Sequence, residues 1–425
     1  MRRLLCHTVV TFVSIAALTG GMLSTVSADN WTRFRGPNGT GIATDTFPAT
    51  WSDSDLLWKV TLPGIGHSSP VVWGDSIFLM SADGDQAQQY LLGIDAQNGS
   101  LRWQQSRPLE KYKIHLRSSY ATSTPCVDEQ RVYAVWTSTT ELVMIATDHA
   151  GNVQWETPLG PYTSQHGFGN SPMRIGDLVV IAIIEGAATE GDPNYPRTGR
   201  VMALDAGNGE VRWTTPRIGR TAAYSVPCIL ESGDGRQQLI GCDTTHGMFS
   251  LDPQTGQENW HVEAFDKRTV SSPVLAGDMI FGSTGSGGGG NYVAAVHLND
   301  DRQTAEVAYK ITKQAPYVPT LVVQDGRAYL WSDKGIVTCI NVETGDEIWQ
   351  QRVGGNFSGS PVIAGKHIYC IDEEGTVVVL ATGDKYELLG KIPLGEASRS
   401  TPAIANGRMY LRTYSHLMAV GGSQP

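Results

Sequence analysis

Short segments in which hydrophobic and polar residues alternate recur along the chain after residue 28. The segments 76–80 and 327–331 fit this pattern, and turn-forming pairs such as Gly277-Asp278 and Asn406-Gly407 lie between such segments. Alternation with a period of two is typical of β-strands that bury one face. No long segment follows the 3.6-residue period of a helix, so the pattern predicts an all-β protein.

A Ser/Thr-Pro pair placed before an apolar strand marks an internal repeat. This pair, or Val-Pro in its place, puts prolines at positions 70, 125, 172, 227, 273, 319, 361 and 402. Their spacing averages about 47 residues, which suits four short strands and three turns, the content of one propeller blade.

A second marker follows later in each unit: Asp or Asn, then Gly, then Trp. It occurs at Asp95, Gly99 and Trp103; Asp148, Gly151 and Trp155; Asp205, Gly209 and Trp213; Asp252, Gly256 and Trp260; and Asn341, Gly345 and Trp349. The carboxylate or amide suits a turn, Gly supplies a left-handed backbone, and Trp covers the gap between neighbouring sheets. We assign a structural role because the same residues recur in unit after unit.

The two ends of the chain complement each other. The last unit begins at Thr401-Pro402 and stops before a Trp-bearing fourth strand, whereas residues 56–60 supply such a strand around Trp58. The sequence therefore predicts an eight-bladed β-propeller of four-stranded antiparallel blades, closed by an N-terminal strand. Blades 5 and 7 are irregular, with Tyr309 or Leu388 near the expected Trp position.

The first 28 residues have the order of a secretory signal: Arg2 and Arg3, an apolar stretch over residues 9–22, and small residues ending at Ala28. A membrane anchor is the alternative, but Gly20-Gly21 interrupts a stretch already short for a spanning helix. We expect a signal peptide at 1–28, a leader at 29–54, the propeller at 55–421 and a tail at 422–425. The mature protein would be periplasmic or secreted, with no membrane span.

The charge balance argues against nucleic acid as a partner. Lys and Arg number 32 against 42 Asp and Glu, a formal net charge of −10, and nonspecific binding to phosphates needs a basic face. Five cysteines follow the signal, so at least one thiol is unpaired. Cys228 and Cys242 flank a turn-rich segment, and the sequence leaves their pairing open.

The Ser-Ser-Pro-Val and Leu-Asp-x-x-x-Gly-x-x-x-Trp units resemble the PQQ-like β-propeller repeats of the quinoprotein alcohol dehydrogenase-like superfamily. Chain size and blade count are similar to those of BamB-like exported propellers, which are non-enzymatic assembly factors. The opening segment 31–39 also looks like the leader of exported members. This resemblance implies a fold but leaves the activity open.

The dehydrogenases that these repeats resemble hold a quinone on the propeller axis beside a calcium ion. They also have a catalytic Asp and, in many members, a disulfide between adjacent cysteines, so the resemblance implies that an enzyme of this kind would need the same features. This sequence has no adjacent cysteine pair, and no Glu, Asn and Asp set can be assigned to calcium. We therefore assign no catalytic residue and no metal ligand. The cofactor is left unknown, with PQQ as a candidate that lacks a full site.

The longer insertions, at residues 106–120, 158–170, 185–200 and 283–291, fall on the face formed by the D-to-A and B-to-C connections. Long loops on a rigid scaffold usually carry binding, so this face is the expected functional surface. The candidate ligand-binding residues precede the inner strands: His67, Arg117, Tyr120, His166, Asn170, Tyr224, Tyr317, Phe357 and Arg399. One loop is basic, with Arg107, Lys111, Lys113, His115 and Arg117, and would attract an anionic ligand or acidic peptide.

Three functions follow from these observations. The favoured one is an exported scaffold that binds a protein, peptide or envelope component on its loop-rich face without chemistry of its own. The alternatives are a PQQ-dependent oxidoreductase acting on alcohols or sugars, and a polysaccharide-binding propeller in which Tyr120, Tyr224, Tyr317 and Phe357 stack on sugar rings.

Overall fold

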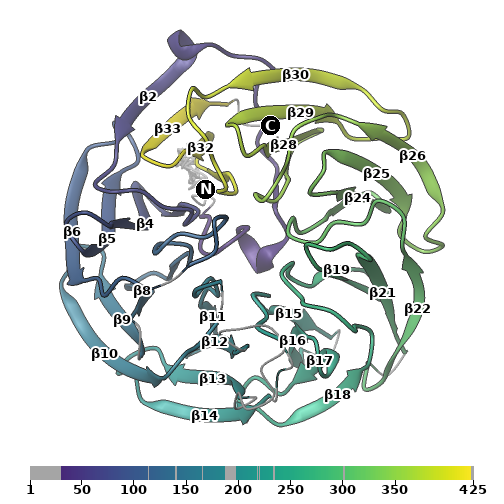
Figure 1. The fold of residues 1–425 in the computed structure, drawn as a ribbon, viewed down its shortest axis with the longest axis horizontal. Coiled ribbons are helices and arrows are strands. Elements are labelled where there is room, and N and C mark those ends of the chain that lie inside the picture. Colours follow the sequence, from purple (N-terminus) through teal and green to yellow (C-terminus); the bar gives the residue numbers. More distant parts are fainter. Residues whose placement is uncertain are drawn as a thin grey trace, which may run out of the picture.

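Eight sheets stand around a central axis, and the four strands of each blade pair antiparallel from an innermost strand to an outermost strand on the rim (Figure 1). The computed structural model describes residues 30–422 except 113, 139–140, 165, 187–197, 218, 220, 233–234 and 300–301. The expected signal peptide lies outside the described residues. The predicted eight-bladed propeller is confirmed.

Blade 1 contains β3 (Val71–Trp73), β4 (Ser76–Asp83), β5 (Gln88–Asp95) and β6 (Leu101–Pro108). Blade 2 contains β7 (Cys126–Val127), β8 (Arg131–Thr137), β9 (Leu142–Asp148) and β10 (Val153–Gly160). Blade 3 contains β11 (Met173–Ile175), β12 (Leu178–Ile184), β13 (Gly199–Asp205) and β14 (Val211–Pro216). Blade 4 contains β15 (Cys228–Glu231), β16 (Gln237–Asp243), β17 (Gly247–Leu251) and β18 (Glu258–Val262).

Blade 5 contains β19 (Val274–Ala276), β20 (Met279–Thr284), β21 (Tyr292–Leu298) and β22 (Ala305–Ile311). Blade 6 contains β23 (Val322–Gln324), β24 (Arg327–Trp331), β25 (Ile336–Asn341) and β26 (Glu347–Arg352). Blade 7 contains β27 (Val362–Ala364), β28 (His367–Ile371), β29 (Thr376–Ala381) and β30 (Leu388–Pro393), with β1 (Ile42–Ala43) added in parallel to β27. Blade 8 contains β31 (Ala403–Ala405), β32 (Arg408–Arg412), β33 (His416–Gly421) and β2 (Leu56–Thr61).

Strand β2 closes the ring. It pairs antiparallel with β33, so the outermost strand of the last blade comes from the start of the propeller, as the sequence predicts. Two short 3₁₀ helices, η1 (Pro37–Gly39) and η2 (Asp53–Asp55), precede it. No helix in the described part of the chain has the length and apolar character needed to cross a membrane.

A chain of hydrogen bonds around the axis explains the Ser/Thr-Pro repeat. In seven places the backbone N–H of the residue at the start of one inner strand donates to a side-chain hydroxyl, at 2.9–3.1 Å, in the next blade. The acceptors are Ser69, Thr124, Ser171, Ser272, Thr320, Ser360 and Thr401. Val226 has no hydroxyl, so it donates to Ser272 but accepts nothing through its side chain.

This chain of hydrogen bonds shows which residues of blade 6 correspond to the Ser/Thr-Pro pair of the other blades, and they differ from the Val-Pro pair that the sequence predicts. The Val318-Pro319 pair is two residues out of register, because Thr320 occupies the Ser/Thr position and Leu321 the proline position before β23. Proline is favoured at the other sites since it fixes φ and keeps the preceding residue extended. A hydroxyl, and not proline itself, is therefore the feature that links blade 6 to its neighbours.

The Trp and Gly of the second marker meet across blade boundaries. Trp58, Trp103, Trp155 and Trp213 each pack on the marker Gly of the following blade, as does Tyr309 from blade 5. These glycines have φ between 72° and 87°. A Cβ on any of them would lie 2.4–2.7 Å from the covering ring, so both the backbone and the packing require glycine.

The irregular blades 5 and 7 fill the Trp position differently. In blade 5, the Tyr309 hydroxyl donates to the Val342 carbonyl at 2.5 Å, as the indole N–H of Trp349 does to Gly383 at 3.0 Å. In blade 7 the residue at the Trp position is Gly390 and not Leu388, because Gly390 pairs with the middle of β29 as Trp349 pairs with the middle of β25. The backbone of leader residue Ala49 lies directly over Gly390.

The leader crosses the axis and closes the propeller on the face opposite the long loops. Trp31 forms a bridge with Val72 of β3, and Ile363 of β27 donates to Gly41. Between them, Arg35 is fully buried, and its guanidinium donates to the carbonyls of Gly39, Thr40, Thr320, Leu321 and Pro361. Burial lowers the pKa of Arg35 to about 9, so it stays charged at neutral pH.

Replacing Trp58 tests ring closure. Trp58→Ala should lower the free energy of unfolding by about 3–5 kcal/mol, because the ring of this buried side chain covers blade 1. The adjacent Leu57 is 50% exposed on the same strand, and Leu57→Ala should change stability by less than about 0.5 kcal/mol. Equal denaturation midpoints for the two variants would contradict closure by β2.

Replacing Arg35 tests the leader. Arg35→Ala leaves several buried carbonyls without a donor and should lower the free energy of unfolding by about 3 kcal/mol or more. Arg107→Ala is the control, since it removes only a surface ion pair with Glu156 and should cost less than about 1 kcal/mol. Denaturant unfolding followed by tryptophan fluorescence measures both, and an unaffected Arg35→Ala protein would show that the leader is not a structural closure.

Candidate functional site

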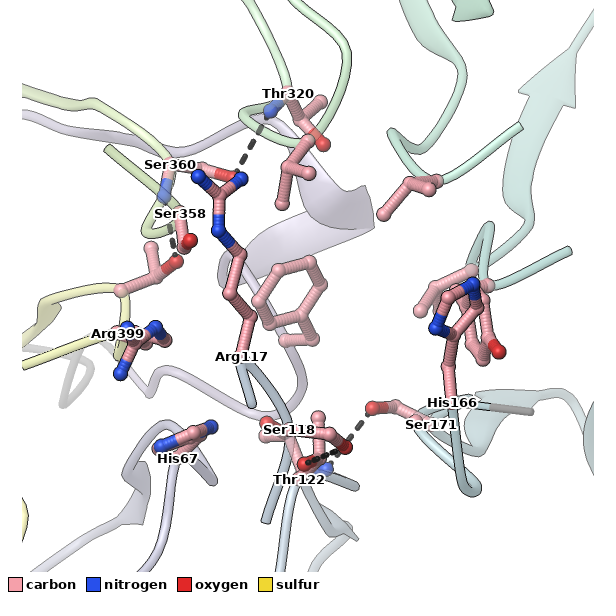
Figure 2. A pocket seen from close by; sticks show the side chains of 18 of the residues that line it. His67, Arg117, Ser118, Thr122, His166, Ser171, Thr320, Ser358, Ser360 and Arg399 are labelled. Carbon is pink, nitrogen blue, oxygen red and sulfur yellow. Dashed lines mark hydrogen bonds between the residues drawn. The ribbon is translucent and has the colours of Figure 1, made fainter. Parts of the chain in front are cut away.

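An axial cavity of about 290 Å³ opens on the loop-bearing face, and hydroxyls of the inter-blade hydrogen bonds form part of its wall (Figure 2). Phe34 lines the cavity and comes from the leader, which crosses the inner strands beyond the hydroxyls. The cavity is therefore a blind pocket with an aromatic group at its closed end.

Two arginines on one side of the cavity share a carboxylate. Arg399 Nη2 lies 3.2 Å from Glu373 Oε2, and Arg117 Nε lies 3.7 Å from Glu373 Oε1. The Ser358 hydroxyl donates to the same carboxylate at 2.6 Å. Asp333 lies nearby, where it accepts the Tyr317 N–H at 2.7 Å, and burial raises its pKa.

On another side of the cavity, Arg268 contacts neutral groups. Its Nη1 donates to His166 Nε2 at 2.7 Å and to the Tyr317 hydroxyl at 3.3 Å. Its Nε is buried without a hydrogen-bond partner, and it forms no ion pair within the described part of the chain. Arg268 is thus the cavity arginine without a carboxylate beside it.

Two of the three cavity histidines, His67 and His166, are held neutral. Burial, then the nearby Arg268 and His115, lower the pKa of His166 to about 4. Burial, then Arg399 and Arg412, lower the pKa of His67 to about 3. At neutral pH Arg117, Arg268 and Arg399 therefore give the cavity positive charge, whereas the imidazoles of His67 and His166 are uncharged.

The structure brings six of the nine sequence-predicted residues to the cavity: His67, Arg117, His166, Tyr224, Tyr317 and Arg399. Three others lie elsewhere. Tyr120 donates its hydroxyl to the Tyr112 carbonyl at 2.7 Å, and Asn170 is buried with both amide atoms unpartnered.

Phe357, the third, does not line the cavity. It is completely buried and packs edge-on against Trp331, with ring centres 5.3 Å apart. The stacking surface expected for a sugar is reduced accordingly to Tyr224 and Tyr317 at the cavity. In the basic loop, Arg117 and His115 line the cavity, whereas Lys113 lies outside the described residues.

Sequence reasoning missed Arg268 and Phe34. Arg268 lies five positions before Pro273, in the same segment preceding an inner strand that supplied the other candidates. That position was a usable signal. No signal in the sequence indicated Phe34, because the leader precedes the repeats and the repeat spacing does not show where the leader runs.

The residues present match a bound quinone only in part. The three arginines suit the carboxylates of PQQ. Among the described residues, however, no group of three His, Cys, Asp or Glu side chains is arranged to hold a metal ion. The five described cysteines are buried free thiols at separate positions, including Cys228 and Cys242, so the paired-cysteine feature of the dehydrogenases is not matched.

The fold and the axial cavity define an eight-bladed β-propeller built from PQQ-like repeats. The sequence profile of the family described as outer membrane protein assembly factor BamB matches residues 13–186, 197–300 and 289–420. The chain belongs to that family.

BamB from Moranella endobia (strain PCIT) is 23% identical over 251 residues, a match that covers 59% of this chain and 56% of the relative. The match thus spans little more than half the length of that relative.

Two solved structures share the fold. BamB from Moraxella catarrhalis has a TM-score of 0.59 and 17% identity, covering 85% of this chain and 97% of that one. Quinohemoprotein alcohol dehydrogenase from Comamonas testosteroni has a TM-score of 0.66 and 13% identity, covering 93% of this chain and 81% of that one. At such identities the likeness shows the fold alone.

A pair of arginine variants tests the electrostatics of the cavity. Arg268→Gln should raise the pKa of His166 and leave that of His67 unchanged, whereas Arg399→Gln should do the reverse. Histidine-selective NMR titration measures both values. If the two imidazoles respond equally to both variants, the assignment of each arginine to its own histidine is wrong.

The same pKa values set an acid limit on stability. Because the folded-state pKa of His166 is lowered from 6.5 to about 4, the unfolded chain takes up a proton in this window and the folded protein does not. Stability contributed by His166 is therefore present above pH 6.5 and falls as the pH drops toward 4.

Proposed function

We propose that this protein is an exported, non-catalytic scaffold that binds a protein partner of the cell envelope through its loop-bearing face. The observation that carries the proposal is the axial cavity, which combines three arginines with aromatic walls and faces the longer loops. Membership of the BamB family supports a role in assembly of outer-membrane proteins.

The charge distribution supports a specific partner. The protein is acidic overall, with a formal net charge of −10, yet the cavity concentrates cationic groups. The positive potential of the cavity attracts an anionic group, whereas the acidic surface around it repels the same group. Such an arrangement orients a partner at the cavity rather than binding acidic proteins over the whole surface.

Site-specific photo-crosslinking tests the proposed face. A crosslinker replacing Leu116, which is 94% exposed in a cavity-lining loop, should give a discrete protein adduct in envelope extract. The same group at exposed Lys385, in the β29–β30 turn on the opposite face, should give none.

Arg117→Ala combined with Arg399→Ala should reduce the Leu116 adduct severalfold, because both cations border the cavity. The adduct is identified by mass spectrometry and its formation repeated with the purified partner. Equal labelling from both faces, or an adduct indifferent to the double substitution, would count against the loop-bearing face as the binding surface.

A further inference from the structure

We propose that the axial cavity receives the carboxylate side chain of an acidic peptide segment, and that Arg268 is its principal contact. This inference rests on the proposed function and adds the chemistry of the partner. The segment would carry an apolar residue next to its acidic residue, because the loop at the cavity mouth presents an apolar side chain as well as a cation.

Arg268 carries the first step because no carboxylate of the described residues forms an ion pair with it. Its Nη1 is fixed by neutral His166 and by the Tyr317 hydroxyl, so the guanidinium is held in place without being neutralised. The Nη2 group makes no hydrogen bond within the described chain. A positioned guanidinium with free donors is suited to a carboxylate, which forms short, charge-assisted hydrogen bonds with it.

The other two arginines strengthen the same preference. Arg117 and Arg399 have Glu373 between them, so one carboxylate faces two guanidiniums. Asp333 accepts backbone N–H groups close to Arg117, and its raised pKa shows that burial disfavours its charge. The three arginines outnumber Glu373 and Asp333, so the cavity has a net positive charge at pH 7, where His67 and His166 are neutral.

The mouth of the cavity favours a peptide over a small anion. His115 and Arg117 line the cavity, while Leu116 between them is 94% exposed. The other large exposed hydrophobic side chains of the described chain are only 42–52% exposed. A small anion inside the cavity would leave Leu116 in water, whereas a peptide with neighbouring acidic and apolar residues would engage both groups.

The walls suit the stem of an acidic side chain. Phe34, Val226, Val270 and Tyr224 line the cavity together with the charged groups. The methylene groups of a glutamate can pack on these apolar surfaces while its carboxylate meets Arg268. Inter-blade hydrogen bonds occupy seven of the N–H groups before the inner strands, whereas the Nε–H of Arg268 has no hydrogen-bond partner in the described part of the chain.

Fluorescence anisotropy with the labelled peptide Glu-Glu-Leu-Glu-Glu, blocked at both ends, tests the proposal on the full chain. The wild-type protein should bind it, and should bind the Gln-Gln-Leu-Gln-Gln peptide at least about tenfold more weakly. Binding should also weaken between about 50 mM and about 500 mM salt, because the attraction is partly screened.

Arg268→Ala should weaken binding of the acidic peptide about tenfold or more, and Arg268→Lys should recover part of the loss. Lys385→Ala removes the same charge from the opposite face and should leave the affinity unchanged. Thermal unfolding of each variant confirms that a loss of binding does not come from a loss of folding.

Leu116→Ala should weaken binding of the Leu-containing peptide but not binding of Glu-Glu-Ser-Glu-Glu. The difference between the two peptides isolates the apolar contact. Equal affinity for the Glu and Gln peptides would overturn the proposal, and so would an affinity for the acidic peptide that Arg268→Ala leaves unchanged. Binding of PQQ in an Arg268-dependent manner, with no binding of the acidic peptide, would also overturn it and assign the cavity to a cofactor. A Leu116 crosslink that persists in Arg268→Ala would leave the scaffold function intact while rejecting the acidic chemistry.

Discussion

The fold depends on hydrogen bonds that a single blade cannot complete. The N–H group at the start of an inner strand has no strand partner within its own sheet, and in most blades a hydroxyl of the next blade accepts it. The bond from Thr401 to Ser69 joins the last blade to the first. Each such bond contributes about 1 kcal/mol, but together they fix the radial position of every inner strand. This constraint explains why Ser or Thr recurs beside the axis in a repeat that varies elsewhere.

The same constraint creates a site. Because the inner strands are held at a fixed radius, the axis contains a space that side chains from the loops and the leader must fill or border. The leader fills the end opposite the long loops with Arg33 and Arg35, whose guanidiniums donate to backbone carbonyls and to a methionine sulfur. At the loop-bearing end, Arg117, Arg268 and Arg399 border an open cavity. Arginine thus has two uses on one axis: cross-linking blades where it is enclosed, and providing charge where it faces space.

The propeller fold alone does not identify the function of this protein. A BamB and a quinohemoprotein dehydrogenase share the propeller at low identity, so blade architecture does not distinguish binding from oxidation. In this chain, the described cavity pairs guanidiniums with neutral imidazoles and aromatic walls. This combination favours recognition of an anionic group and underlies the scaffold function proposed here.

The sequence by itself determined the blade number, the strand order and the closing role of Trp58, because alternate burial and turn chemistry act over a few residues and repeat with each blade. It also indicated several of the charged and aromatic residues of the cavity, since residues before an inner strand must approach the axis. Only the tertiary structure decided that Thr320 takes the Ser/Thr position in blade 6, that Phe357 turns into the core and that Arg268 faces the cavity with no ion pair to any described carboxylate. Side-chain directions at the axis depend on contacts between blades far apart in sequence, and the path of Phe34 depends on all the strands it crosses. The spacing of residues along the chain therefore determines neither the side-chain directions at the axis nor the position of Phe34.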